Sequence, residues 1–308
     1  MKSFARQVHH STMKGRIFAC FAGGKAGGRE LDFASDLDLF FLYEGEGRTG
    51  RGVGNQELFA EVAREVIQTL GDGLFAVDAR LRPEGHNAPV VISLAGYRRY
   101  LATRGATWER LALSRARPVA GDVDLGRRAL GVIERFVYGG GLDAGAIDEI
   151  LAMRRRMEPT PERGSGPEID NKRGPGGIVD AEFIAQILAL RHAAARPALR
   201  HTSTRVVLER MVEAGALTRS DGRDLLLGYE RLRQVQKSLR LLGEAARHAL
   251  PATGVELEVL ARATSAASGA ALVYEVTSLM ARTRQLFDAV AGRLRAEVAA
   301  QAMNPGTR

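Results

Sequence analysis

Short apolar runs bounded by turn-forming residues predict the first β-strands of this chain. Residues 16–23 and 36–43 are rich in Phe, Leu and Ile, each run is bounded by Gly or Asp, and a glycine-rich turn separates them. Residues 74–82 alternate between apolar and charged positions, which predicts a strand with one charged face. Residues 89–93 predict one more short strand.

Helical spacing follows these strands. Apolar residues recur every four positions after the glycine-rich loop 45–54, and they predict one face of a helix: Leu58, Val62, Val66 and Leu70. Three further helices are predicted over 94–103, 106–115 and 122–138. This mixture of strands and helices predicts an α+β domain over residues 1–157.

The pattern changes after residues 158–177, where proline and glycine are concentrated. We interpret this segment as a linker or an active-site loop. From 178 to 302 the apolar spacing is helical almost throughout, which predicts a helical bundle domain, and residues 303–308 form a tail.

Composition is typical of a folded protein, with 45% hydrophobic and 26% charged residues. The 44 basic and 36 acidic residues give a formal net charge of +8. Charge alone is weak support for a nucleic-acid partner, which we do not expect, whereas a phosphate-rich small ligand suits the same charge.

Cysteine content and hydropathy indicate the cellular location. The single Cys20 excludes an intramolecular disulfide and a cysteine metal cluster, so we expect a cytoplasmic protein and a buried, inert thiol. No apolar stretch approaches the roughly 20 residues of a membrane span, so we expect no membrane association. The lone Trp108 is interpreted as a core residue.

A pair of carboxylates carries the chemistry. Asp36 and Asp38 lie two residues apart on a predicted strand, so both carboxylates point to one face while the intervening leucine points to the other. Adjacent carboxylates suit a hard cation such as Mg²⁺, which prefers oxygen ligands. Because such a pair also occurs by chance at solvated strand ends, it is weak support by itself.

Two neighbouring features strengthen the case. The preceding turn, residues 23–30, is rich in glycines that let backbone amides approach a phosphate. A third carboxylate, Asp78, lies on another predicted strand beside Arg80 and Arg82, and these arginines suit a triphosphate. Three carboxylates can hold two metal ions. Asp78 and Arg80 could equally form a plain surface ion pair.

Four strings resemble one known family, the repeats of the bacterial glutamine-synthetase adenylyltransferases, which belong to the polymerase-beta-like nucleotidyltransferases. They occur in the family's order and at roughly its spacing: FACFAGGKAGGRELDFASDLDLFFLY, VDARLRPEG, WERLALSRARPVAGD and DNKRGPGGIVDAEFIAQ. The resemblance implies a nucleotidyltransferase domain, with a small mixed sheet and flanking helices, followed by an α-helical bundle.

The resemblance also assigns roles. It implies that Asp36, Asp38 and Asp78 are catalytic and bind metal, with two Mg²⁺ ions expected and ATP as the substrate. The implied phosphate-side and nucleotide-binding residues are Gly27, Gly28, Ser35, Arg80, Arg82 and Lys172. For Lys172 and its glycine-rich loop, a purely structural role at a helix N-terminus remains an alternative.

The family's reaction attaches AMP from ATP to a tyrosine hydroxyl of glutamine synthetase, and the other half of the enzyme removes it by phosphorolysis. This sequence contains one copy of the family's catalytic half, and its motifs resemble those of the adenylylating half more closely. Glutamine synthetase is the implied partner, with the PII signalling protein as a second candidate. The alternatives are deadenylylation, a superfamily member acting on RNA, and a regulatory or truncated module that binds nucleotide without turnover.

Overall fold

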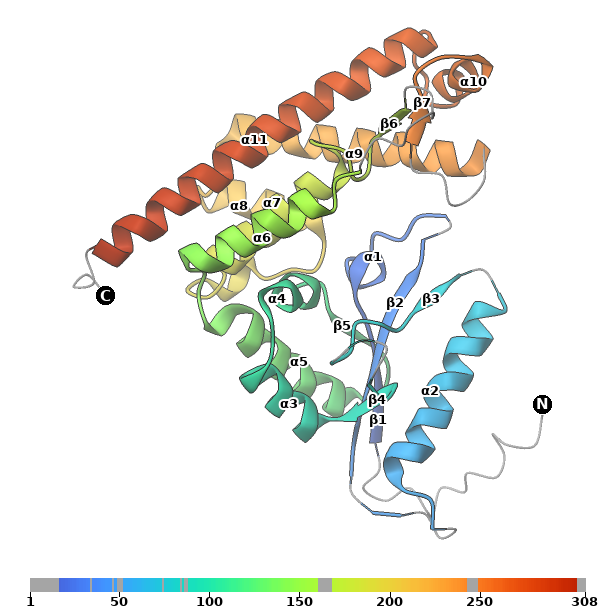
Figure 1. Ribbon diagram of the computed structural model, residues 1–308, viewed down its shortest axis with the longest axis vertical. Helices are drawn as coiled ribbons and strands as arrows, with labels where there is room; N and C mark the ends of the chain where they lie inside the picture. The colour runs from blue at the N-terminus through green and yellow to red at the C-terminus, as the bar shows by residue number, and fades with distance from the viewer. Residues whose placement is uncertain are drawn as a thin grey trace. The chain divides into compact units, whose positions relative to one another are not determined.

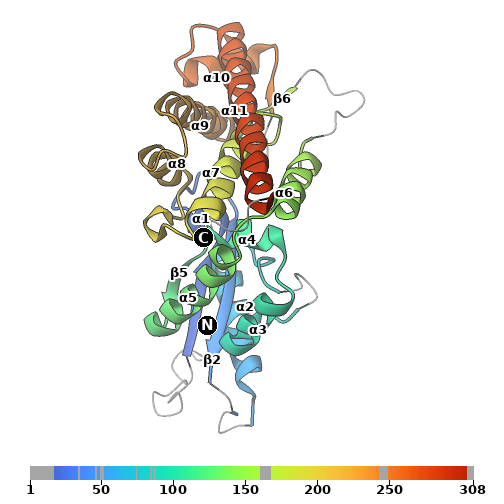
Figure 2. The ribbon, with the colours of Figure 1, turned by 90° about the vertical axis from the view of Figure 1, so that its left-hand side faces the viewer.

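The computed structural model describes residues 17–303, with gaps at 34, 46, 49–51, 74, 84, 86–87, 160–167 and 243–248. Contacts divide the chain into two compact units (Figures 1 and 2). The first comprises Met1–Leu31 and Ser35–Gly140, and the second comprises Asp32–Ala34 and Gly141–Arg308. No helix among the described residues is long and apolar enough to cross a membrane.

A mixed sheet forms the centre of the first unit. Strand β1 (Ile17–Ala22) pairs antiparallel with β2 (Leu37–Glu44) on one side and with β5 (Arg117–Gly121) on the other. The two remaining strands, β3 (Val77–Asp78) and β4 (Val91–Ser93), pair in parallel with successive stretches of β2. The expected α+β fold with a small mixed sheet is confirmed.

Helices cover both faces of this sheet. On one face, α2 (Asn55–Gly71) packs against a core that includes Cys20, Leu39 and Phe41. On the other face, Phe40 stacks on Phe21 and contacts Tyr97. The helices of that side are α3 (Leu94–Thr103), α4 (Thr107–Leu113) and α5 (Val123–Gly139).

Several sequence expectations differ in detail from this unit. The strand expected over 74–82 shrinks to β3, because Arg80 and Arg82 bind side-chain and carbonyl oxygens nearby instead of extending a ladder. Strand β5 was not predicted. The lone Trp108 is 47% exposed, so its interpretation as a core residue is wrong. The buried residues of α2 include Phe59 and Ala63, and of the predicted face Val66 and Leu70 pack against the same core.

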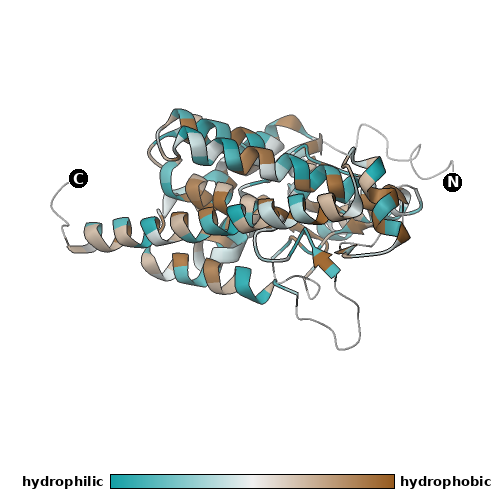
Figure 3. Ribbon diagram, turned by 90° about the horizontal axis from the view of Figure 1, so that it is seen from above, coloured by the Kyte–Doolittle hydropathy of each residue, from teal (hydrophilic) through white to brown (hydrophobic). Residues whose placement is uncertain are grey.

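The second unit is mainly helical, as expected. Its helices are α6 (Ala144–Arg156), α7 (Ile178–His192), α8 (Thr204–Glu213), α9 (Arg219–Leu242), α10 (Val255–Ala263), α11 (Gly269–Met303) and the 3₁₀ turn Pro197–Leu199. Apolar and hydrophilic residues alternate around these helices (Figure 3). The exception is α7, which contacts α6, α8, α9 and α11 and is therefore buried on nearly all sides.

Two features of this unit were not predicted. Strand β6 (Glu168–Asp170), within the expected linker, pairs antiparallel with β7 (Ala249–Pro251). Helix α6, which the sequence boundary at 157 assigned to the first domain, belongs to the second unit because it packs against α7 and α11.

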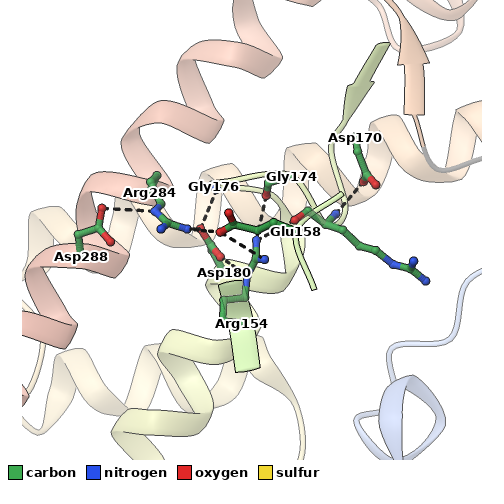
Figure 4. Close-up of polar contacts among 9 residues, drawn as sticks. Arg154, Glu158, Asp170, Gly174, Gly176, Asp180, Arg284 and Asp288 are labelled. Atoms are coloured by element: carbon green, nitrogen blue, oxygen red, sulfur yellow. Dashed lines mark hydrogen bonds and ion pairs between the residues drawn. The ribbon is translucent and has the colours of Figure 1, made fainter. Parts of the chain in front are cut away.

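A buried ion pair lies at the beginning of α7 (Figure 4). Arg154 of α6 and Asp180 of α7 have fully buried side chains, and the Arg154 Nε donates to an Asp180 carboxylate oxygen. The other Asp180 oxygen accepts from the backbone N–H of Gly176 at 2.7 Å. Arg284 of α11 approaches the same oxygen at 3.5 Å. Buried charges are tolerated only when they are paired in this way.

The same network fixes the loop that precedes α7. The Arg154 Nη2 donates to the carbonyls of Arg173 at 2.9 Å and Gly174 at 3.0 Å. Gly176 has a φ of +78°, and a Cβ there would lie 1.7 Å from the Met280 carbonyl oxygen. The glycine-rich loop therefore has its shape set by packing against α6 and α11.

We expect Asp180→Ala to lower the free energy of unfolding of the second unit by about 3–5 kcal/mol, because it removes the buried partner of Arg154 and leaves it the partly exposed Glu158 at 3.6 Å. Urea denaturation followed by circular dichroism measures this. Asp148→Ala is the matched control, since Asp148 pairs with Arg295 on the surface with 62% of its side chain exposed. Its loss should cost under about 1 kcal/mol. Equal effects of the two substitutions would contradict a special role for the buried pair.

Candidate active site

Three predicted carboxylates lie at the same end of the sheet. Asp38 is the register partner of Asp78 across the parallel pair β2 and β3, and Asp36 directly precedes β2. Along the same face of β2, the next residues Phe40 and Leu42 are fully buried. The carboxylates therefore stand where the helical cover of this face ends.

An open pocket of about 520 Å³ adjoins this end of the sheet. Its lining contains four of the predicted residues: Asp36, Asp78, Arg80 and Arg82. Val77 and the alanines on either side of the β3 pair complete it. Acidic and basic predicted residues thus meet in one pocket, as a site for an anionic ligand with a bound cation requires.

Asp38 carries the clearest electrostatic signature. Its pKa is raised to about 6, chiefly by burial and then by the negative charges of Asp78 and Asp36. Arg115 and Arg80 act in the opposite direction and do not cancel the rise. Burial is the main cause and the two neighbouring carboxylates add to it, so a bound cation would relieve part of the cost of an ionised Asp38.

Asp78 is engaged by the arginine two residues further on. Its Oδ1 accepts from the backbone N–H of Arg80 and from the Arg80 Nε, both at 2.8 Å. Its Oδ2 accepts from the same Nε at 2.7 Å and from Nη2. As these side chains lie, no three acidic, His or Cys residues of the described chain are grouped closely enough to hold one metal ion.

Arg82 is tied to the backbone of its own loop. Its guanidinium donates to the carbonyl of Ala79 and, at 3.3 Å, to that of Ala88. Partial burial lowers the pKa of its side chain. Arg82 thus lines the pocket while it holds the turn after β3 together.

The glycine turn meets the carboxylates at Gly24. This residue has a φ of +47°, and a Cβ there would lie 1.9 Å from the Asp38 Oδ2. The adjacent Gly23 N–H donates to the Asp38 carbonyl at 2.8 Å. Only glycine fits a backbone that approaches a side chain so closely at positive φ. Sequence analysis did not single out Gly24, although it lies in the same glycine-rich string.

Gly27 and Gly28, the predicted phosphate-side glycines, pack against Arg115. A Cβ on Gly27 would lie 1.9 Å from the Arg115 carbonyl oxygen, and one on Gly28 would lie 2.3 Å from the Arg115 Nη2. Their lack of a side chain is thus required by the segment between α4 and β5. Their predicted contact with phosphate stays a prediction.

Arg115 and Arg117 are residues that sequence analysis missed. The buried Arg115 guanidinium pairs with the buried Glu30 at the end of the turn. Arg117 donates to the carbonyls of Gly27 at 3.0 Å and Ala26 at 2.9 Å, which are the last carbonyls of the short helix α1 (Gly24–Gly27). Both arginines lie in the third family-like string, which was the available signal.

The remaining predicted residues lie elsewhere. Ser35 is buried directly before Asp36. Lys172 belongs to the second unit, in the loop before α7, where its backbone N–H donates to Asp170 Oδ1 at 2.9 Å and its side chain is half-buried. Their proposed contacts with a nucleotide stay predictions.

Comparison with known proteins extends these observations. A family model described as glutamate-ammonia ligase adenylyltransferase matches residues 1–132, and one described as GlnD PII-uridylyltransferase matches residues 148–295.

Similar curated proteins share one name, bifunctional glutamine synthetase adenylyltransferase/adenylyl-removing enzyme. The one from Xanthomonas axonopodis pv. citri is 36% identical over 96% of this chain and 33% of its own length. Those from Xanthomonas oryzae pv. oryzae and Stenotrophomonas maltophilia K279a are 34% and 37% identical, over 90% and 78% of this chain and 30% and 26% of their own. The chain spans about a third or less of the length of these relatives.

We expect Gly24→Ala to destabilise the first unit by about 1–3 kcal/mol, because it combines positive φ with a clash against Asp38. Gly131→Ala is the control: it lies inside α5 with open space around the new methyl group, so it should be neutral or stabilising by up to about 1 kcal/mol. Thermal denaturation compares the two. A Gly24→Ala protein as stable as the wild type would contradict the close approach.

Asp38→Asn should stabilise the nucleotide-free protein at pH 7.5 in the presence of EDTA. A carboxyl whose native pKa is about 6, against 3.8 in the unfolded chain, makes its full contribution to the stability of the native state below about pH 4. That contribution is lost as pH rises through 6. We therefore expect the variant to exceed the wild type by about 1–3 kcal/mol at pH 7.5 and to match it near pH 4. A pH-independent difference in urea denaturation would contradict this assignment.

Proposed function

The chain belongs to the glutamate-ammonia ligase adenylyltransferase family, and from that membership we propose that it transfers an adenylyl group between a nucleotide and glutamine synthetase. The observation that carries the proposal is the meeting of Asp36, Asp38 and Asp78 at one end of the sheet, beside a pocket lined with arginines. This arrangement combines oxygen ligands for a cation with positive charge for a polyphosphate.

Mg²⁺ fits this donor set. All the candidate ligands are carboxylate oxygens, which Mg²⁺ prefers, and the negative charges of Asp78 and Asp36 add to burial in raising the pKa of Asp38. Asp36 and Asp38 would hold one or two ions, with Asp78 as a further ligand. When bound, the metal would neutralise charge that develops on the transferred phosphoryl group and the leaving oxygen.

The protein's own residues would bind and orient the nucleotide. We assign Arg80 and Arg82 to the phosphates of ATP, because guanidinium groups form charge-assisted hydrogen bonds with phosphate oxygens. The role of Lys172, which lies in the second unit, stays what the sequence resemblance implies. Ser35 and the Gly27–Gly28 backbone are assigned to the same phosphate side. Arg115 and Arg117 would act as positioning residues, since they hold the turn that bears these glycines.

The reaction we propose is in-line attack of a tyrosine hydroxyl of glutamine synthetase on the α-phosphorus of ATP. A bond forms between the tyrosine oxygen and that phosphorus, the bond to the β,γ-diphosphate breaks, and pyrophosphate leaves. The hydroxyl proton would pass to Asp78 or to solvent. The adenylylating direction rests on the resemblance of the sequence motifs, whereas the relatives' names include both directions.

The second unit supports a further assignment. Its match to a PII-uridylyltransferase model favours the PII signalling protein as a second candidate partner. We expect a PII protein to change the rate of adenylyl transfer rather than to accept the adenylyl group.

Asp36→Asn combined with Asp38→Asn should lower AMP transfer about a thousandfold or more, because it removes the ligands of a metal that stabilises several kcal/mol of developing charge. The assay is incubation with α-labelled ATP, Mg²⁺ and glutamine synthetase from the same organism, with and without glutamine. Asp124→Asn, the same change at a side chain that is 77% exposed on α5, should leave transfer unchanged.

Separate assays distinguish the alternatives. ADP formed from adenylylated glutamine synthetase and phosphate would identify deadenylylation. Binding of ATP without any product would identify a non-catalytic module, and RNA binding with a steep salt dependence would favour an RNA-directed enzyme. Wild-type transfer by the double variant would contradict the assignment of the carboxylates.

A further inference from the structure

We propose that Arg80 and the metal compete for Asp78, so that nucleotide binding, by drawing Arg80 away, completes the metal site. This inference rests on the proposed function and describes how the same site is assembled. Its starting point is the Asp78–Arg80 pair, in which both carboxylate oxygens accept from the guanidinium.

Asp78 and Arg80 form their contact within a stretch of three consecutive residues. The Arg80 backbone N–H and its side chain both bind Asp78, so the contact forms without help from any distant element. Arg80 has 64% of its side chain exposed, whereas Asp78 has 19%. Arg80 can therefore leave Asp78 by rotating its side chain into the pocket that both residues line, without unfolding of β3.

A metal ion and Arg80 have conflicting demands on Asp78. A cation bound beside Asp38 would take an Asp78 oxygen as an inner ligand, since Asp78 is the register partner of Asp38 on the neighbouring strand. In this structure the planar guanidinium of Arg80 donates hydrogen bonds to both carboxylate oxygens of Asp78.

A triphosphate offers Arg80 an alternative partner. Phosphate oxygens accept the same two parallel hydrogen bonds as a carboxylate, and a triphosphate carries more negative charge. When Arg80 binds phosphate, the Asp78 oxygens no longer accept from its guanidinium, and the metal can bind one of them. Because such coupling is reciprocal, metal and nucleotide should each strengthen the binding of the other.

Arg82 provides a matched comparison. It lies two residues further along and lines the same pocket, but its guanidinium donates to the carbonyls of Ala79 and Ala88, and Asp78 acts on it through its charge. A Lys substitution at either position keeps the positive charge and removes the fork. The substitution at Arg80 should change metal binding to Asp78 more than the one at Arg82.

The test is Mn²⁺ binding to the nucleotide-free protein, measured by electron paramagnetic resonance of the free ion. We expect Arg80→Lys to bind Mn²⁺ about twofold more tightly than the wild type, and Arg80→Gln about fivefold, since an exposed ion pair of this kind is weak. Arg82→Lys should match the wild type. Arg82→Gln should show only a small gain from its lost charge. Adding Asp78→Asn to Arg80→Gln should abolish the gain.

Each outcome is decisive for the competition. An Arg80→Gln gain that Arg82→Gln equals, or that survives Asp78→Asn, would overturn the proposal, as would equal Mn²⁺ affinity of Arg80→Gln and the wild type. If Mn²⁺ binding in that last case still depends on Asp38, the metal site of the proposed function stands and only the competition fails. If no form binds Mn²⁺ in a way that depends on Asp38, the metal site itself is refuted.

Discussion

Repulsion among three carboxylates at one end of β2 is the constraint around which the first unit is arranged. The parallel pairing of β2 with β3 sets Asp38 beside Asp78, and the two-residue alternation of β2 adds Asp36 to the same face. Burial is the largest cause of the raised pKa of Asp38, and the charges of Asp78 and Asp36 raise it further. Selection for stability alone would not retain three carboxylates at this end of the sheet, so a functional site is the better explanation.

The surrounding structure limits this cost without removing it. Gly24 brings the backbone against the Asp38 carboxylate, and the Phe40 and Leu42 side chains fix β2 beneath the helices of that face. Arg115, which is buried and pairs with Glu30, acts through its positive charge to lower the pKa of Asp38. The site is thus held rigidly on its inner side, while Arg80 on its outer side is exposed and able to exchange partners.

Local patterns were sufficient to predict β1, β2, α2 and the face of the strand that bears Asp36 and Asp38, because each depends on a few consecutive residues. They were insufficient where distant segments decide the structure. Arg115 binds Glu30, which lies 85 residues earlier in the sequence. Strand β5 forms by pairing with the edge of β1. Strand β6 pairs with β7, which is far from it in the sequence. Trp108 misled because amino-acid type does not reveal which helix face is covered. The pairing of Asp78 with Arg80 was one of two interpretations that the sequence left open, and the structure contains it.

The central claim is that Asp36, Asp38 and Asp78 form a metal-dependent nucleotidyl-transfer centre. A crystal structure of the protein with Mn²⁺ and α,β-methylene-ATP, with anomalous scattering recorded to locate the metal, tests it most directly. We predict anomalous peaks within ligand distance of Asp36 and Asp38, Asp78 turned toward the metal, and Arg80 on the phosphates. Nucleotide and Mn²⁺ bound away from these carboxylates would contradict the claim.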